Sequence, residues 1–310
     1  MQERKRSLPR VLWKQRTLCL MILPAIILLF MFNYLPLYGL TIAFRDFNYR
    51  DGIWNSPWIG LKNFRILLVS GKTMLRLVKN TFMYYAVFTA LGTICNIALA
   101  IMLNECHGKH FARYSHTVMI LPTFLSWVAV TYIAKAFLGT SDGLINNVRA
   151  ALGQKPVNWY LSAGYWPAIL TIIQIWKSTG YGAIMYLSAL CGMDPAIFEA
   201  ATIDGAAKAQ QIRYLTLPML RPLVSIMLLL SLGGIMTSNT GLFYRVTLNT
   251  GILYSTTQTI DAYIMNAVTQ GTTQYGLTSA VSFFQSMVGF VMVVGTNLIV
   301  RRVAPENALF

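Results

Sequence analysis

Two residue patterns in this sequence could carry chemistry, and each is incomplete. Ser70–Thr73 reads Ser-Gly-Lys-Thr, the end of a phosphate-binding loop, but that motif needs a glycine where Ile66 stands. His107 and His110 form a His-x-x-His pair with His116 nearby, yet no glutamate or cysteine set completes a metal site. We therefore expect no catalytic residue, no metal site, no cofactor and no ATP hydrolysis in this chain.

Charged residues are scarce inside the apolar segments. Lys135 and Lys177 lie near or within them, and no acidic residue is visible there. A proton relay or a sodium site normally needs an acid at membrane depth, so the pattern disfavours an ion-coupled transporter. Lys177 allows two interpretations. It could hold the carboxylate of an acidic sugar, or, as the favoured alternative, it snorkels or donates hydrogen bonds to a carbonyl of a neighbouring helix.

Uncharged polar residues are more plentiful in these segments. For any one of them, hydrogen bonding between helices is the commoner role. Together with nearby aromatic side chains they could line a path for a neutral, hydroxyl-rich solute, because sugars need amide and hydroxyl partners and aromatic faces. The candidate path residues are Gln174, Trp176, Lys177, Ser238, Asn239 and Gln285.

The composition places the elements that carry these residues in a membrane. Of the 310 residues, 55% are hydrophobic and 11% are charged, whereas a soluble domain has about 25% charged residues. The net charge of +15 could indicate nucleic-acid binding. No zinc-finger or RNA-binding pattern accompanies it, so we expect no nucleic-acid partner and assign the basic residues to membrane lipids. The four cysteines form no Cys-x-x-Cys pair and are expected to be free thiols.

Six apolar blocks predict an all-α membrane domain with six transmembrane helices, since each block can cross a hydrocarbon core of about 30 Å. The expected spans are 17–44, 78–105, 114–138, 165–191, 219–241 and 275–300. The first block is too long for a signal peptide and lacks a small-residue cleavage site, so a retained span is expected. The chain is thus predicted to comprise a basic N-terminal segment, 1–16, and one six-span domain, 17–310.

The N-terminal segment holds six basic residues and one acid, and the flank of the first span usually dominates the orientation. Both termini and the connection after the fourth span are therefore expected in the cytoplasm. The connection 45–79 fits less cleanly because it is also basic. Within it, Leu61, Phe64 and Leu68 share one helical face. Lys62 and Arg65 face away, which predicts a short helix in the outer interface.

The connection after the fourth span contains small residues and helix formers in an unusual mixture. "EAATIDGAAKAQQIRYLTLPMLRP" runs from Glu199 to Pro222. Asp194 is a candidate N-cap with Pro195 at the first helical position, and Gly205 can take the left-handed geometry that ends a helix. Pro218 shapes the start of the fifth span. We expect a short helix–turn–helix whose small residues let a partner's backbone come close.

This segment closely resembles the EAA loop of permease subunits in binding-protein-dependent ATP-binding-cassette (ABC) importers. The family pattern is present as Glu199-Ala200-Ala201, Asp204-Gly205-Ala206 and Leu215-Thr216-Leu217-Pro218. Three further stretches look like parts of the sugar-importing branch: "WIGLKNF" (Trp58–Phe64), "NTFMYY" (Asn80–Tyr85) and "IWKSTGYG" (Ile175–Gly182). The sequence is most similar to oligosaccharide permeases of the lipoprotein and aldouronate type. It lacks the extra spans and large outer domain of the enteric maltose permease's longer subunit.

The resemblance implies a type I importer permease fold in which the loop at 194–218 docks in a groove of a separate ATPase. The implied coupling residues are Glu199, Ala200, Ala201, Asp204, Gly205, Leu217 and Pro218, with Glu199 as the acidic contact and Gly205 as the turn. The implied partners are a second homologous permease, an ABC ATPase dimer that binds the ATP, and an extracellular lipid-anchored sugar-binding protein.

The sequence thus predicts a non-catalytic permease subunit of a sugar importer, multi-pass in a bacterial cell membrane, with oligosaccharides as the expected solutes. Two alternatives stay open. One is a permease of the same kind for another solute, such as a peptide or a polyol. The other is a non-transporting membrane receptor or scaffold, which would leave the 194–218 segment unexplained.

Overall fold

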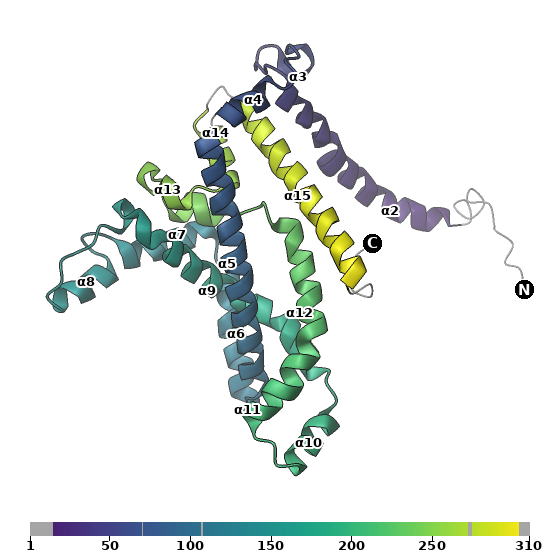
Figure 1. Ribbon diagram of the computed structural model, residues 1–310, viewed down its shortest axis with the longest axis vertical. Helices are drawn as coiled ribbons and strands as arrows, with labels where there is room; N and C mark the ends of the chain where they lie inside the picture. Colours follow the sequence, from purple (N-terminus) through teal and green to yellow (C-terminus); the bar gives the residue numbers. More distant parts are fainter. Residues whose placement is uncertain (1–14, 70, 107, 272–274, 304–310) are drawn as a thin grey trace, which may run out of the picture. The chain divides into compact units, whose positions relative to one another are not determined.

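The described structure is helical over most of its length (Figure 1). A computed structural model describes residues 15–69, 71–106, 108–271 and 275–303. Within these ranges no β-sheet forms, and the one extended pairing is an isolated bridge between Arg45 and Trp58. The expected all-α class is confirmed. Most of the predicted segment 1–16 lies outside the described residues, as do Ser70, His107 and the side chain of His110.

The chain divides into two compact units, and the division falls within helices α4 and α15. Unit 1, residues 1–66 and 273–283, contains α2 (Arg16–Leu29), the π-helical η1 (Phe30–Tyr34), the 3-10 helix η2 (Leu35–Phe44), α3 (Gly52–Asn55), and the first turns of α4 (Lys62–Val69) and α15 (Tyr275–Val303). Unit 2 contains the rest: α5 (Gly71–Asn104), α6 (Lys109–Phe124), α7 (Trp127–Leu138), α8 (Leu144–Ala151), η3 (Trp159–Leu161), η4 (Ala163–Tyr165), α9 (Trp166–Cys191), α10 (Pro195–Ile203), α11 (Lys208–Gln211), η5 (Ile212–Thr216), α12 (Leu217–Ser231), η6 (Leu232–Gly234), η7 (Gly241–Val246), η8 (Gly251–Leu253), α13 (Tyr254–Thr257) and α14 (Ile260–Thr269).

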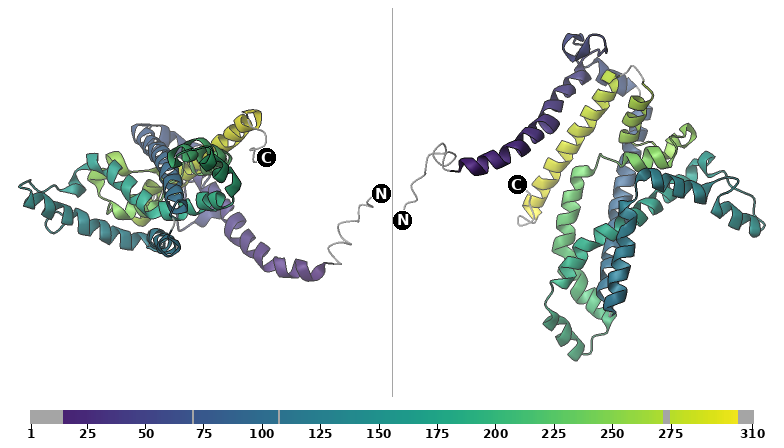
Figure 2. Two further views of the ribbon diagram at one scale, coloured as in Figure 1. Left: turned by 90° about the horizontal axis from the view of Figure 1, so that it is seen from below. Right: turned by 180° about the vertical axis from the view of Figure 1, so that it is seen from behind.

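Unit 2 is built on α5, α9 and α12, which pack against one another. Figures 1 and 2 both place α10 and α11 at one end of this unit and α13 and α14 towards the other. Two glycines of α9 let neighbouring helices come close. A Cβ on Gly180 would lie 1.8 Å from the carbonyl oxygen of Met119 in α6, and one on Gly182 would lie 2.4 Å from the amide of Asn96 in α5. Only glycine fits against the α6 backbone at Gly180, whereas at Gly182 a larger residue would have to displace the Asn96 side chain.

Four helical stretches of the described residues are long and apolar enough to cross a membrane by themselves. They are Arg16–Phe44, Gly71–Asn104, Lys208–Gly234 and Tyr275–Arg302. Two further pairs, Tyr114–Phe124 with Trp127–Leu138 and Ala163–Cys191 with Pro195–Ile203, pass only when each bent pair is counted as one span. The structure therefore has four to six candidate spans, and six is reached only with the bent pairs.

The predicted third span is not one straight helix. Its two halves, α6 and α7, meet at 99°. Pro122 stands three residues before the break, and the side chain of Ser126 caps α7 by accepting the Ala129 amide at 3.2 Å. A serine that starts a new helix shortly after a proline is a recognisable stop-and-start signal, which the hydropathy pattern conceals.

The predicted fifth span, 219–241, is displaced along the sequence. The helix begins at Lys208 and ends at Gly234 in a 3-10 turn, so 235–239 is not helical. The connection that follows it is folded rather than loose. It contributes Leu242, Val246 and Leu253 to a core that also contains Trp166, and all four side chains are fully buried.

Candidate functional site

The segment 194–218 forms the expected helix–turn–helix. The Asp194 carboxylate accepts the Ala196 amide at 2.9 Å, and Pro195 occupies the first turn of α10. The helix ends in a Schellman motif: the Ala206 amide donates to the Ala201 carbonyl and the Gly205 amide to the Thr202 carbonyl. Gly205 has a φ of +79°, which a side chain would strain. The predicted cap and turn are both confirmed.

A buried glutamine fixes the angle between the two arms of this hairpin. Gln211, 4% exposed, donates through Nε2 to the Thr202 hydroxyl at 3.0 Å and to the Ala206 carbonyl at 3.2 Å. On the outside, the Ala207 amide donates to the Gln210 side chain at 2.7 Å. Side-chain hydrogen bonds therefore hold the two helices of the hairpin together, so that α11 is expected to move when α10 moves.

Beyond α11 the helix continues through the π-helical turn η5 into α12, whose first two residues are Leu217 and Pro218. Proline has no amide hydrogen to donate to the preceding turn, and a wide turn before it relieves the crowding of its ring. The predicted Leu-Pro end of the pattern therefore lies inside one continuous helix, and joins the hairpin to a candidate span.

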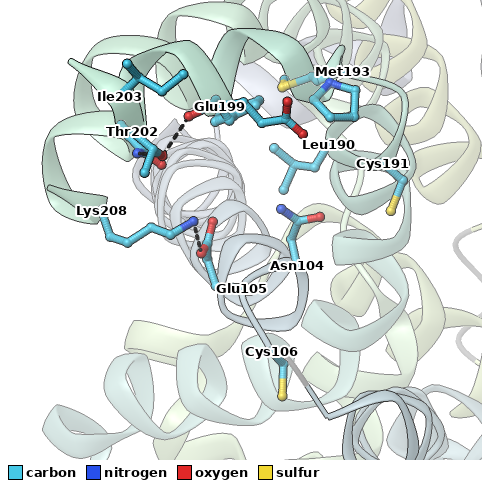
Figure 3. A pocket seen from close by; sticks show the side chains of 13 residues that line it. Asn104, Glu105, Cys106, Leu190, Cys191, Met193, Glu199, Thr202, Ile203 and Lys208 are labelled. Carbon is cyan, nitrogen blue, oxygen red and sulfur yellow. Dashed lines mark hydrogen bonds and ion pairs between the residues drawn. The ribbon is translucent and has the colours of Figure 1, made fainter. Parts of the chain in front are cut away.

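Between the hairpin and the ends of α5 and α9 lies an open cavity of about 620 Å³ (Figure 3). Glu199 and Thr202 line it from α10, and Lys208 bridges it by an ion pair to Glu105 at 3.1 Å. Glu199, Ala200, Asp204 and Gly205 are exposed, and Ala201 is half-buried. The segment thus presents an acidic, small-residue helix to the surroundings while an ion pair ties its base to α5.

Lys177 has all three of its N–H groups engaged within the chain. Its Nζ donates to the carbonyls of Pro122, Thr123 and Leu125 at 3.0, 2.9 and 2.6 Å, and it lies 5.2 Å from the centre of the Trp127 ring. These carbonyls end α6 at the bend. The geometry favours the second interpretation given above, hydrogen bonding to a neighbouring helix, and leaves no N–H for a solute carboxylate.

Ser238 and Gln285 meet at an acid that the sequence does not place beside them. Asp261 accepts the Ser238 amide at 2.5 Å, the Ser238 hydroxyl at 3.1 Å and the Gln285 amide at 3.0 Å. The sequence-based expectation that no acid lies near these candidates is therefore wrong, because hydrogen bonds bring Asp261 of α14 to Ser238 and Gln285. Asn239 does not join this cluster and instead caps η7 through the Leu242 amide.

The other two candidates, both on α9, differ in surroundings. Trp176 is 43% exposed and lines an apolar cavity of about 400 Å³ formed with α7 and α8. The side-chain oxygen of Gln174 is buried and has no hydrogen-bond partner among the described residues. The six predicted path residues therefore do not form one cluster.

A polar groove that the sequence analysis missed lies between α5, α9 and α12, with a volume of about 260 Å³. Thr89, Thr93 and Asn96 line it from one face of α5, and Ser178 and Ser231 line it from the other two helices. The Asn96 side-chain oxygen is buried and unpaired in the described chain. The spacing of four and then three residues on α5 could have revealed this polar stripe in an otherwise apolar span.

No three His, Cys, Asp or Glu side chains come together as a metal site within the part of the chain that the structure describes. Cys95, Cys106 and Cys191 are free thiols.

A helical membrane domain with an exposed, internally braced hairpin between two candidate spans defines a class of transport protein. Residues 89–305 match the family described as "Binding-protein-dependent transport system inner membrane component", and the chain belongs to that family. It is an inner-membrane component of a binding-protein-dependent transport system.

Particular relatives agree with this assignment over nearly the whole chain. The sequence is 32% identical over 307 residues to the polygalacturonan/rhamnogalacturonan transport system permease protein YteP of Bacillus subtilis (strain 168), which covers 99% of this chain and 94% of that one. The fold of the present chain matches a chain in the crystal structure of a bacterial ABC transporter involved in the import of the acidic polysaccharide alginate. The TM-score is 0.86 and the identity 31%, and the match covers 96% of this chain and 100% of that one. A crystal structure of an alginate ABC transporter in complex with an alginate pentasaccharide-bound periplasmic protein matches with a TM-score of 0.84, 30% identity, and coverage of 96% and 98%.

Proposed function

We propose that this chain is the permease subunit of an ATP-driven importer of oligosaccharides, and that it couples to a separate ATPase dimer through the segment 194–218. The observation that carries the proposal is the hairpin itself. Its outer helix is exposed and rich in small residues, while Gln211 and the Lys208–Glu105 pair brace its inner side. A partner can bind such a hairpin, and the hairpin can then move together with α12 as one rigid body.

In this proposal the chain itself catalyses no reaction and holds no cofactor, and ATP is bound by the partner. The other partners are a second homologous permease and an extracellular lipid-anchored sugar-binding protein. The named complex of an alginate transporter with its periplasmic protein supports an assembly of this kind. Both termini and the hairpin lie in the cytoplasm in this scheme.

We further propose that the solute passes the polar groove. The Ser178 and Ser231 hydroxyls donate to carbonyls of their own helices and can still accept. Together with the Thr89 hydroxyl and the Asn96 amide, they supply the neutral polar groups that sugar hydroxyls need. Of the sequence-based candidates, Gln174 fits this role best because its side-chain oxygen is buried and unpaired. The relatives named for polygalacturonan and alginate favour acidic oligosaccharides within this class.

Coupling is tested with Glu199→Lys in the reconstituted transporter, against Asp142→Lys as a control at an exposed acid far from the hairpin. Loss of a desolvated charged contact at an interface costs about 2–5 kcal/mol, so the Glu199 variant should insert normally but fail to stimulate the ATPase or to import sugar. The control should do both. Normal ATPase stimulation by the Glu199 variant would contradict the proposed coupling role.

Orientation is tested with an impermeant thiol reagent on single cysteines in intact cells. A cysteine at Ser141 or Thr250 should react from outside, and one at Gln210 only after the membrane is opened. Reaction of the Gln210 position in intact cells would reverse the proposed topology.

The groove is tested with Thr89→Val, which removes a hydroxyl that lines the groove without changing the shape. Its control is Thr171→Val on α9, whose hydroxyl donates to its own helix at Pro167. Losing one hydrogen bond of about 1 kcal/mol should weaken apparent sugar affinity about fivefold for Thr89 and leave the control unchanged. Both neutral and uronic-acid oligosaccharides are assayed. Equal uptake by both variants with every sugar would place the path elsewhere.

A further inference from the structure

Two tryptophans of unit 1 run alongside the end of the first apolar helix. Tyr38 and Phe44 are six residues apart in the 3-10 helix η2, and because this helix has three residues per turn they share one face. Trp54 stacks on Tyr38 with ring centres 4.4 Å apart, and Trp58 stacks on Phe44 with ring centres 5.5 Å apart. The indoles therefore lie along the axis of the helix, two turns apart.

The backbone that carries the two indoles is held firmly. Arg45 donates through Nη1 to the carbonyls of Trp54 and Ser56, both at 2.9 Å, and its guanidinium lies 5.8 Å from the Trp58 ring. Asn63 donates to the carbonyls of Ala43 and Arg45 at 2.9 and 3.1 Å. This bonding ties the loop to the end of η2, so the positions of the rings are fixed by the fold.

Despite their stacking partners, both rings face outward. Trp54 is 75% exposed and Trp58 is 63% exposed. Their surface continues that of the apolar helix, whose Leu35 and Leu37 are also exposed. Water is an unfavourable environment for so much aromatic surface, whereas the boundary between acyl chains and headgroups accepts both the ring and its N–H group.

We propose that the segment 45–66 is seated in the headgroup layer of the membrane, with Trp54 and Trp58 as its anchors. The exposed side chains of Lys62 and Arg65 on α4 supply positive charge for anionic phosphate headgroups. A lipid surface is favoured over a protein partner because the indoles lie along the flank of a membrane-crossing helix. A site for an incoming protein would instead project beyond the end of that helix.

The test uses the whole transporter reconstituted in vesicles with lipids brominated on their acyl chains near the headgroup. The signal is the difference in tryptophan fluorescence between the wild type and the double variant Trp54→Phe, Trp58→Phe. Brominated lipid should quench most of it, and aqueous iodide should quench little. The emission removed by Trp166→Phe, at a fully buried ring, should respond to neither quencher.

The basic residues are tested by comparing brominated phosphatidylglycerol with brominated phosphatidylcholine. The wild type should be quenched several-fold more effectively by the anionic lipid, and Lys62→Gln with Arg65→Gln should abolish this preference without changing the folded yield. Iodide quenching without lipid quenching would overturn the proposal. So would protection from iodide that develops only when the extracellular binding protein is added, because the surface would then belong to that protein. Neither result depends on which solute is carried.

Discussion

Replacing Lys177 with methionine should destabilise the permease strongly, although the substitution adds apolar surface to an apolar protein. The lysine is 9% exposed and donates to three carbonyls at the end of α6. The Pro122 carbonyl also accepts the Leu125 amide, so the loss falls mainly on the carbonyls of Thr123 and Leu125. A buried carbonyl left without a partner costs about 1–3 kcal/mol. Two of them give a loss of about 2–6 kcal/mol.

The measurement is the thermal unfolding midpoint of the purified protein in detergent, followed by uptake in vesicles. A loss in this range should lower the midpoint of a 310-residue chain by about 3–9 °C. Lys135→Met on α7 is the matched control, because Lys135 is exposed and the same substitution should change little there. The apparent affinity for an acidic oligosaccharide should be the same for surviving Lys177→Met protein and for wild type. An unchanged midpoint with a weakened affinity for acidic sugar alone would refute the reasoning and make Lys177 a solute ligand.

Three further predictions follow from contacts in unit 2. Gly180→Ala should lower the unfolding midpoint because its Cβ would overlap a carbonyl of α6, whereas Gly289→Ala, with nothing within 4 Å, should raise it slightly through helix propensity. Glu105→Lys and Lys208→Glu should each reduce sugar-dependent ATPase activity by no more than about fivefold, as befits a pair worth about 1 kcal/mol or less, and the double variant should recover it; no recovery would show that the pair does not act as a unit. Asp261→Ala should lower the maximal velocity of uptake equally for neutral and acidic sugars and leave the apparent affinity for both unchanged. A change in apparent affinity for one sugar class would instead place Asp261 on the path.

The hairpin could be predicted from the sequence because its determinants are local. Asp194 caps the helix two residues before the amide that it accepts, and Gly205 ends it within one turn. Such signals lie within a short window and do not depend on the rest of the chain. The role of Gln211 could not be predicted in the same way, because an exposed glutamine and a buried one look alike in a helix-forming run.

The contacts that the connection after α12 makes with the helices could not be predicted from the sequence. The amide of Asn80 donates to the Gln258 carbonyl, and the Tyr84 hydroxyl donates to the Thr256 carbonyl, across more than 170 residues. Asp261 of α14 likewise accepts a hydrogen bond from Gln285 of α15, 24 residues further along the chain. Hydropathy identifies which segments are apolar but carries no information about which polar residues of a connection return to them.

The polar groups on the apolar helices fall into two sets. Lys177 and Gln285 use their hydrogen-bonding capacity inside the chain, and each joins two segments that would otherwise separate. Gln174 and Asn96 each keep a buried side-chain oxygen unpaired within the described chain. Burying such an oxygen without compensation is unfavourable by about 1–3 kcal/mol, so its presence favours a partner that a single permease does not supply. A sugar hydroxyl can donate to either oxygen, and so can the second permease. Uptake and assembly measured on the same Asn96→Leu variant would therefore separate a path residue from an interface residue.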